Sequence, residues 1–496
     1  MRRPTSSSPN RKTWFMFLIA AVALALLAPL ARAQAQFSLR KISVDTFTNA
    51  SSQHKSEVEP DTFAYGSTIV SAFQVARIYS GGGADIGFAT STDGGNTWVH
   101  GYLPGLTVNY KGGGFSAASD ASVAYDAKHG QWLISALPLG AVADVSVSRS
   151  PDGLHWGRPI AVDRSGGDDK NWIVCDNSPS SPFYGNCYTE WDTPTTFMST
   201  STDGGLTWGP AKATADHAVG VGGQPLVQPN GTVIVPIAGS NGLITFSSTD
   251  GGATWGRSRS ISSVIEHGEQ GGLRSAGLPS AEIDAAGKIY VVWSDCRFRT
   301  GCSTNDLVLS TSTDGTTWTA PARIPIDPTS STVDHFIPGL GVDPNTSGDT
   351  AHLALTYYYY PVSQCGNSCE LDVGFVTSDD GGATWTQGKQ LAGPMQLNWL
   401  PNTFSGLMVA DYLSTSYVNG NPFGVFVVAG PPSGGVLNQA AFTTTTPLLV
   451  AADEPRLSSK GDKPVPNAKS DFVRKYYDDE WRFPKPPQEQ APPSGK

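Results

Sequence analysis

Three carboxylates follow short apolar runs, where a strand would end and a loop would begin. Glu190 and Asp192 are two residues apart, so both side chains are expected on one side of a strand. Asp295 follows the apolar run 289–293. Acids placed this way could serve as general acid and base, or as nucleophile, on a glycosidic bond. The alternative is structural, because aspartates often open loops by accepting backbone N–H groups.

Basic and aromatic residues also occur near the expected ends of strands, where they could bind a substrate. The candidate substrate-binding residues are Arg274, Arg297, Arg299, Tyr358, Asp411 and Tyr412. Aromatic rings beside charged groups suit a carbohydrate. Arg297 could instead pair with Asp295. Asp168 and Asp169 offer oxygen ligands that would suit Ca²⁺, and no other cofactor is expected.

A repeated motif must position these residues. It reads Ser, any residue, Asp, a glycine-containing turn and Trp, and we call it the Asp box. Its six copies span 91–98, 150–156, 201–208, 248–255, 312–318 and 378–385. Their aspartates, spaced 47 to 66 residues apart, are Asp93, Asp152, Asp203, Asp250, Asp314 and Asp380. That period fits one four-stranded propeller blade per box.

The composition of the box indicates a structural role. Asp-Gly between strand-like runs is a strong hairpin signal, and its Ser and Asp oxygens can accept backbone N–H bonds. Alternating runs such as 85–90 and 243–247 precede the boxes, and another short strand follows. Each box is therefore expected in the turn between strands three and four of a blade.

The resulting fold class is all-β, a β-propeller of four-stranded blades. We count seven blades, and six is the alternative if one early segment is a loop insertion. The seventh unit has no box and offers three strands, near 413–418, 424–428 and 439–443. Residues 38–44 are expected to supply its fourth strand beside 439–443, because an unpaired edge exposes backbone groups.

The six cysteines form three close pairs. Export would favour disulfides, and their local spacing favours Cys175–Cys187, Cys296–Cys302 and Cys365–Cys369. Zinc binding fits poorly, since no CxxC pair occurs.

The ends of the chain differ from its middle. Residues 1–35 resemble a signal peptide, with Arg2, Arg3, Arg11 and Lys12 before an apolar run at 14–30. We expect a secreted or periplasmic monomer, or a membrane-anchored one if that segment is not cleaved. Residues 36–450 form the propeller, and the Pro-rich tail 451–496 is expected to be disordered, with docking through its aromatic residues as the alternative. Residues 36–450 hold 19 basic and 35 acidic residues, which argues against nucleic acid as a partner.

The boxes resemble the bacterial neuraminidase repeat, and residues 60–445 are similar to the sialidase-like superfamily. The resemblance implies a site on the face away from the boxes. It also implies an arginine triad for a substrate carboxylate, a Tyr/Glu nucleophile pair and an aspartate acid/base. Where the family has its first arginine, this chain has Glu59-Pro60-Asp61, and Arg77 is the nearest partial match.

This difference predicts that the chain does not release sialic acid at a sialidase-like rate. The functional hypothesis is recognition of a glycan or another extracellular polymer. The alternatives are an active glycoside hydrolase and a protein-binding scaffold.

Overall fold

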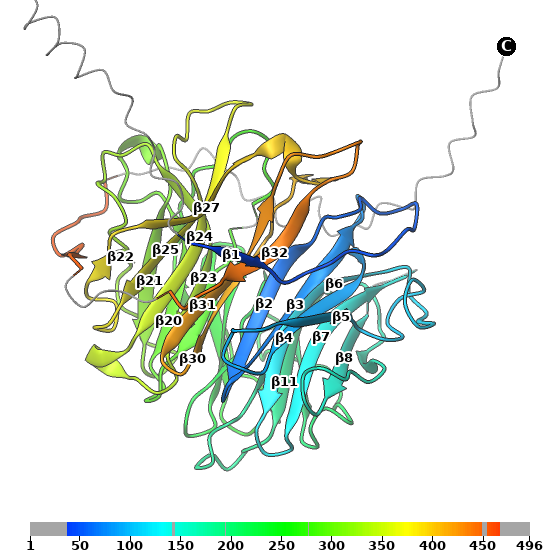
Figure 1. Ribbon diagram of the computed structural model, residues 1–496. Coiled ribbons are helices and arrows are strands. Elements are labelled where there is room, and N and C mark those ends of the chain that lie inside the picture. Colours follow the sequence, from blue (N-terminus) through cyan, green and yellow to red (C-terminus); the bar gives the residue numbers. More distant parts are fainter. Residues whose placement is uncertain (1–36, 141–143, 194, 276, 449–453, 467–496) are drawn as a thin grey trace, which may run out of the picture. The chain divides into compact units, whose positions relative to one another are not determined.

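Antiparallel strands make up nearly all regular structure in the computed structural model, which describes residues 37–140, 144–193, 195–275, 277–448 and 454–466 (Figure 1). Short 3-10 turns lie at Thr300–Cys302, Gly348–Thr350 and Leu397–Trp399. The proposed leader lies outside the described residues. No described helix has the length and apolar character needed to cross a membrane.

The strands form sheets in chain order. An eight-stranded sheet holds β2 (Val58–Tyr65), β3 (Thr68–Arg77), β4 (Gly83–Ser91), β5 (Val99–Tyr102), β6 (Ala117–Asp126), β7 (Gln131–Leu139), β8 (Val145–Ser150) and β9 (Ile160–Asp163). The next sheets are β10 (Asp169–Cys175), β11 (Cys187–Thr193), β12 (Thr195–Ser201) and β13 (Lys212–Ala213), then β14 (Gly220–Val221), β15 (Leu226–Val227), β16 (Val233–Gly239), β17 (Gly242–Ser248) and β18 (Arg259–Ser262).

The C-terminal half continues the pattern. Its sheets are β19 (Ser280–Ile283), β20 (Ile289–Asp295), β21 (Asp306–Ser312) and β22 (Ala322–Arg323), then β23 (Asp334–Val342), β24 (Leu353–Tyr360), β25 (Glu370–Ser378) and β27 (Lys389–Gln396). The last large sheet joins β30 (Ser414–Val418), β31 (Asn421–Ala429) and β32 (Gln439–Thr444) to β1 (Leu39–Lys41). Two-stranded pairs are β26 (Trp385–Thr386) with β33 (Arg456–Leu457), and β28 (Asn402–Thr403) with β29 (Gly406–Leu407).

The first strands of successive repeats contact one another. β2 contacts β6, β6 contacts β10, and the contacts continue through β15, β19, β23 and β30 back to β2. This succession is the β-propeller arrangement, so the expected fold class is confirmed. One pair, Gly83 with Ala118, joins the first two repeats into the eight-stranded sheet. Because sheets and repeats then differ in number, the count of seven blades stays a prediction.

The N-terminal strand pairs with the C-terminal sheet, as predicted. Leu39, Arg40 and Lys41 of β1 lie opposite Thr444, Thr443 and Phe442 of β32. Figure 1 shows this dark-blue strand beside the orange strands. The pairing gives β32 a partner on its outer side and covers its backbone groups.

All six Asp boxes lie in the turns between the third and fourth strands of their repeats. In the first box, Ser91 Oγ accepts from Gly95 N at 2.8 Å and donates to Asp93 Oδ1 at 2.8 Å. Asp93 also accepts from the backbone N–H and the hydroxyl of Thr97, at 2.8 and 2.6 Å. Chiefly through these Thr97 bonds, the pKa of Asp93 falls from 3.8 to about 2. The box aspartates therefore serve as turn acceptors.

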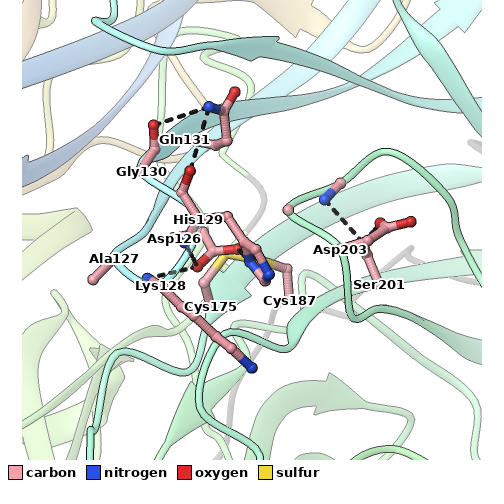
Figure 2. Close-up of polar contacts among 12 residues, drawn as sticks. Asp126, Ala127, Lys128, His129, Gly130, Gln131, Cys175, Cys187, Ser201 and Asp203 are labelled. Atoms are coloured by element: carbon pink, nitrogen blue, oxygen red, sulfur yellow. Dashed lines mark hydrogen bonds and ion pairs between the residues drawn. A yellow bond between two sulfur atoms is a disulfide. The ribbon is translucent and has the colours of Figure 1, made fainter.

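The three predicted disulfides are present. Cys175 and Cys187 face each other across β10 and β11, so this bridge fastens two strands as well as the loop between them. Figure 2 shows it beside the turn between β6 and β7, where Asp126 accepts from the backbone N–H groups of Lys128 and His129 at 3.0 and 3.1 Å. The bridges suggest an extracytoplasmic location.

Residues 454–466 dock on the propeller, which corrects the expectation of disorder for this part of the tail. Arg456 lies in β33 against β26 and pairs with Asp379 at 2.6 Å. Glu454 pairs with Lys389 at 2.8 Å, and the Val465 N–H donates to the carbonyl of Arg297 at 2.7 Å. The aromatic residues further along the tail lie outside the described residues.

Candidate functional site

Four first strands share a bulge with a positive-φ residue, and in three neighbouring strands that residue is charged, whereas in β23 it is Ile337. The pairing register shifts between Val58 and Asp61 in β2, between Ser119 and Ser122 in β6, and between Asp169 and Trp172 in β10. Each of these three bulges contains a charged residue with positive φ: Glu59 (55°), Asp120 (50°) and Lys170 (38°). Bulges re-aim side chains and are common beside active sites. All three occur at the strand ends away from the Asp boxes.

Lys170 occupies a buried position between aromatic rings. Its ammonium lies 3.6 Å from the centroid of the Tyr412 ring and 4.8 Å from that of Trp172. It forms an ion pair with Asp120, with Nζ 3.3 Å from Oδ1. Trp172 and Tyr412 meet edge to face at 5.2 Å. These contacts hold a positive charge among groups from β6, β10 and the segment before β30.

Arg274 and Asp411 form the second charged pair. Arg274 Nε donates to both carboxylate oxygens of Asp411, at 2.9 and 3.0 Å, and Nη2 donates as well. Nη1 donates to Ser405 Oγ at 3.0 Å. Arg274 lowers the pKa of Asp411 in spite of burial, so this carboxylate remains charged. The Arg274 side chain is 21% exposed, so it is the part of this pair that solvent reaches most.

Glu59 and Arg77 adjoin this pair. Gln74 links them, because its Nε2 donates to Glu59 and its Oε1 accepts from Arg77 Nη1 at 3.1 Å. Burial, followed by the carboxylates of Asp120 and Asp411, raises the pKa of Glu59 well above its usual value. Burial, followed by Arg274, lowers the pKa of Arg77 to about 10. Burial therefore favours the neutral form of Glu59, while Arg77 stays charged near neutral pH.

The predicted catalytic pair Glu190 and Asp192 lies on β11, directly behind β10. Their register partners on β10 are Trp172 and Asp169. Both carboxyls are fully buried, and the Glu190 oxygens make no hydrogen bond within the described residues. Burial raises the pKa of both acids, and that of Asp169 to about 8. Burial thus favours the neutral form of these three carboxyls, which lie close to Lys170.

Other predicted residues lie elsewhere. Asp295 is buried, and both of its oxygens accept from Arg297, at 2.8 and 2.6 Å, as in the structural alternative. Arg299 is fully buried and pairs with Asp306 and Asp327. Tyr358 packs in the core, and its hydroxyl donates to the Val427 carbonyl at 3.0 Å. Of the six predicted binding residues, the structure brings together Arg274, Asp411 and Tyr412.

The sequence-based site list omitted Glu59, Asp120 and Lys170. Each lies near the start of a first strand that holds further charged residues, so the sequence did not single it out. Arg77 was noted as a partial motif match, and the structure adds it to the same cluster. We call Glu59, Arg77, Asp120, Lys170, Arg274 and Asp411 the axial cluster.

A narrow cavity runs between the first strands of all the repeats. It is lined by acids, amides and apolar groups that include Asp61, Trp172, Gln224, Glu282, Leu340 and Leu413. Burial raises the pKa of Asp61 to about 7 and that of Glu282 to about 8. Trp172 belongs both to this lining and to the surroundings of Lys170, so the cavity adjoins the axial cluster.

The described residues give little support for a metal site. Among them, one group of three possible metal-ligating side chains has its ligand atoms within 4.8 Å of one another: Asp306, Asp327 and His335. Arg299 already pairs with both of these carboxylates. Asp168 and Asp169, the proposed calcium ligands, have no third such ligand in that range among the described residues.

The boxes and sheets together define a β-propeller whose turns carry Asp boxes. Residues 143–338 match the BNR repeat-like domain family. No curated protein matches this chain.

Solved structures that resemble the chain include sialidases and trans-sialidases. A Hadza microbial sialidase is 17% identical over 68% of this chain and 66% of its own, with a TM-score of 0.40. The NanB sialidase from Streptococcus pneumoniae is 14% identical over 82% and 70%, with a TM-score of 0.41. The intramolecular trans-sialidase from Ruminococcus gnavus is 15% identical over 77% and 92%, with a TM-score of 0.38. The chain thus spans just under two thirds of the Hadza enzyme.

Proposed function

We propose that this protein acts outside the cytoplasm and binds a carbohydrate chain at the axial cluster. One observation carries the proposal: three adjacent first strands each hold a charged residue in a strained bulge, and all three contribute to one cluster. A non-glycine residue at positive φ costs on the order of 1–3 kcal/mol, and such residues concentrate at functional sites.

The chemistry of the cluster favours sugar hydroxyls. A hydroxyl both donates and accepts, so it can bind between a cation and a carboxylate that lie close together. Arg274 with Asp411 and Lys170 with Asp120 are such pairs. Hydrogen bonds to charged groups are about twice as strong as neutral ones, and Trp172 and Tyr412 add apolar ring surface. A free anion would bind less well, because Arg274 and Lys170 each already pair with a carboxylate.

The test uses residues 36–496 on a glycan array, followed by titration of the retained glycans. Lys170→Met is expected to weaken binding by roughly 10–100-fold, from the loss of one charge-assisted contact. The control is Thr207→Val in the third Asp box, which lies at the other end of the blades. Retention of no glycan by the wild type would contradict the proposal and favour the protein-binding scaffold.

Glycoside hydrolysis is a second candidate. The raised pKa values of Asp169, Glu190 and Asp192 support it, because a carboxyl that stays neutral near pH 7 can act as a general acid. Product analysis on each bound glycan tests this activity. Glu190→Gln should then abolish hydrolysis and leave glycan affinity within about threefold. Unchanged hydrolysis by that variant would exclude Glu190 from the reaction.

A further inference from the structure

Two exposed aromatic side chains lie beside the axial cluster. Tyr79 is 53% exposed and Phe404 is 38% exposed. The only other strongly exposed aromatic side chain among the described residues is Tyr65, on the turn between β2 and β3. A single exposed aromatic ring is ordinary, but exposed rings that gather beside a charged cluster can mark a site of ligand contact.

A rigid backbone holds both rings in place. The Phe404 N–H donates to the Tyr79 carbonyl at 3.2 Å. The hairpin of β28 and β29 that carries Phe404 is fixed to Gln53, which exchanges hydrogen bonds of 2.7 and 3.0 Å with the backbone of Asn402. Its other strand bonds to Arg274, whose N–H donates to the Leu407 carbonyl at 2.8 Å. Little conformational entropy would be lost when a ligand binds here.

The two rings are continuous with the axial cluster. Arg77 is the last residue of β3, and Tyr79 lies two residues beyond it. Ser405, next to Phe404, accepts from Arg274 Nη1 at 3.0 Å. The side chains nearest the rings in sequence are Ser80, Thr403 and Ser405, which carry no charge. This patch therefore differs in chemistry from the charged cluster beside it.

We propose that Tyr79 and Phe404 form a second subsite that binds an uncharged sugar ring of the same carbohydrate chain. This inference rests on the proposed function and extends it, because it identifies the ligand as an oligosaccharide and not a single sugar. The apolar face of a pyranose packs on an aromatic ring, while its hydroxyls reach the neighbouring serines. A chain then spans the exposed aromatic subsite and the buried charged cluster.

The experiment titrates residues 36–496 with mono-, di-, tetra- and hexasaccharides of the cello-, chito-, laminari- and xylo- series. We expect wild-type affinity to rise with chain length in at least one series. Tyr79→Ala and Phe404→Ala should each lower the affinity for the longest bound member by about 5–10-fold, as one aromatic contact is worth about 1 kcal/mol. The monosaccharide affinity should not change.

Tyr65→Ala is the matched control, since Tyr65 is 46% exposed but lies at the Asp-box end of its blade. Tyr79→Phe should keep wild-type affinity, because the ring makes the contact. Thermal melting checks that each variant folds.

If Lys170→Met weakens hexasaccharide binding while Tyr79→Ala and Phe404→Ala do not, the subsite is wrong and the proposed function stands. If the wild type binds no member of the four series, a neutral oligosaccharide ligand is excluded and the subsite falls with it.

Discussion

The two ends of the blades use aspartate in opposite ways. At the box end, Asp93 is exposed, accepts several hydrogen bonds and has a pKa lowered to about 2. At the axial end, Asp169 has a pKa raised to about 8, chiefly by burial. Donors hold the first carboxyl as an anion, while the lack of solvation favours a neutral acid at the second. The first arrangement stabilises a turn, and the second favours the neutral form of a carboxyl.

The two ends of the blades also differ in which residues adopt positive φ. The first box obtains positive φ from Gly94 and Gly95, which adopt it at little cost. The axial bulges place Glu59, Asp120 and Lys170 in that region, where a side chain is unfavourable. The axial end therefore holds backbone strain that the rest of the fold must offset.

The largest effect is expected from Lys170→Met. Removal of the ammonium leaves Asp120 buried without its ion-pair partner, which should lower the free energy of unfolding by about 3–5 kcal/mol. Urea unfolding measures it. The double variant Lys170→Met/Asp120→Asn should recover part of the loss, since it removes the isolated charge. Equal stability of Lys170→Met and the wild type would show that the axial end is not under electrostatic constraint.

A smaller effect concerns sialic acid release. Glu59 stands in place of an arginine, and the loss of one bidentate charged contact should slow release by about 10–100-fold relative to a sialidase. Release from a fluorogenic sialoside by residues 36–496 tests this prediction. Rapid turnover that disappears on Arg274→Ala or Arg77→Ala would overturn it and reveal an arginine clamp built from other strands.

At the box end, Ser201→Ala should cost about 1–2 kcal/mol of stability. Ser201 Oγ accepts from Gly205 N at 2.9 Å and donates to Asp203 at 2.9 Å, and both bonds would be lost. Glycan affinity should not change. Differential scanning calorimetry and titration of the same sample separate the two effects, and a loss of affinity without a loss of stability would show that the box end takes part in binding.

The smallest effect is a pH dependence of opposite sign at the two ends. The raised pKa of Asp169 adds stability below about pH 4, and this is lost as the pH rises through about 8. The lowered pKa of Asp93 adds stability above about pH 4, and this is lost as the pH falls through about 2. Asp169→Asn should flatten the decline in Tm between about pH 4 and pH 8 by about 2 °C, and Asp93→Asn should flatten the decline below about pH 4. Parallel curves for the wild type and Asp169→Asn would contradict the assignment.

Local patterns made much of the fold predictable. Each Asp box contains its own acceptors and donors within eight residues, and the disulfide partners are 4 to 12 residues apart. The pairing of residues 38–44 followed from a strand count. The docking of residues 454–466 could not be predicted, because it depends on ion pairs such as that of Arg456 with Asp379, which composition does not reveal.

The site was only partly predictable, for two physical reasons. A bulge changes which side chain faces the axis, so a strict alternation of inward and outward residues misassigns Glu59, Asp120 and Lys170. Ion pairing also depends on distant residues. Arg299 looked available beside Asp295, but Asp306 and Asp327 neutralise it.

The pairing of β1 with β32 also sets the order of events during synthesis. Lys41 is translated roughly 400 residues before its partner Phe442. At 5–20 residues per second, the first strand waits about 20–80 s for the edge that it completes. A chain that terminates early leaves sheet edges open at both ends and exposed to aggregation. The last sheet can therefore be completed only after β32 has been made, so synthesis through Thr444 is a condition for closing the sheet edge.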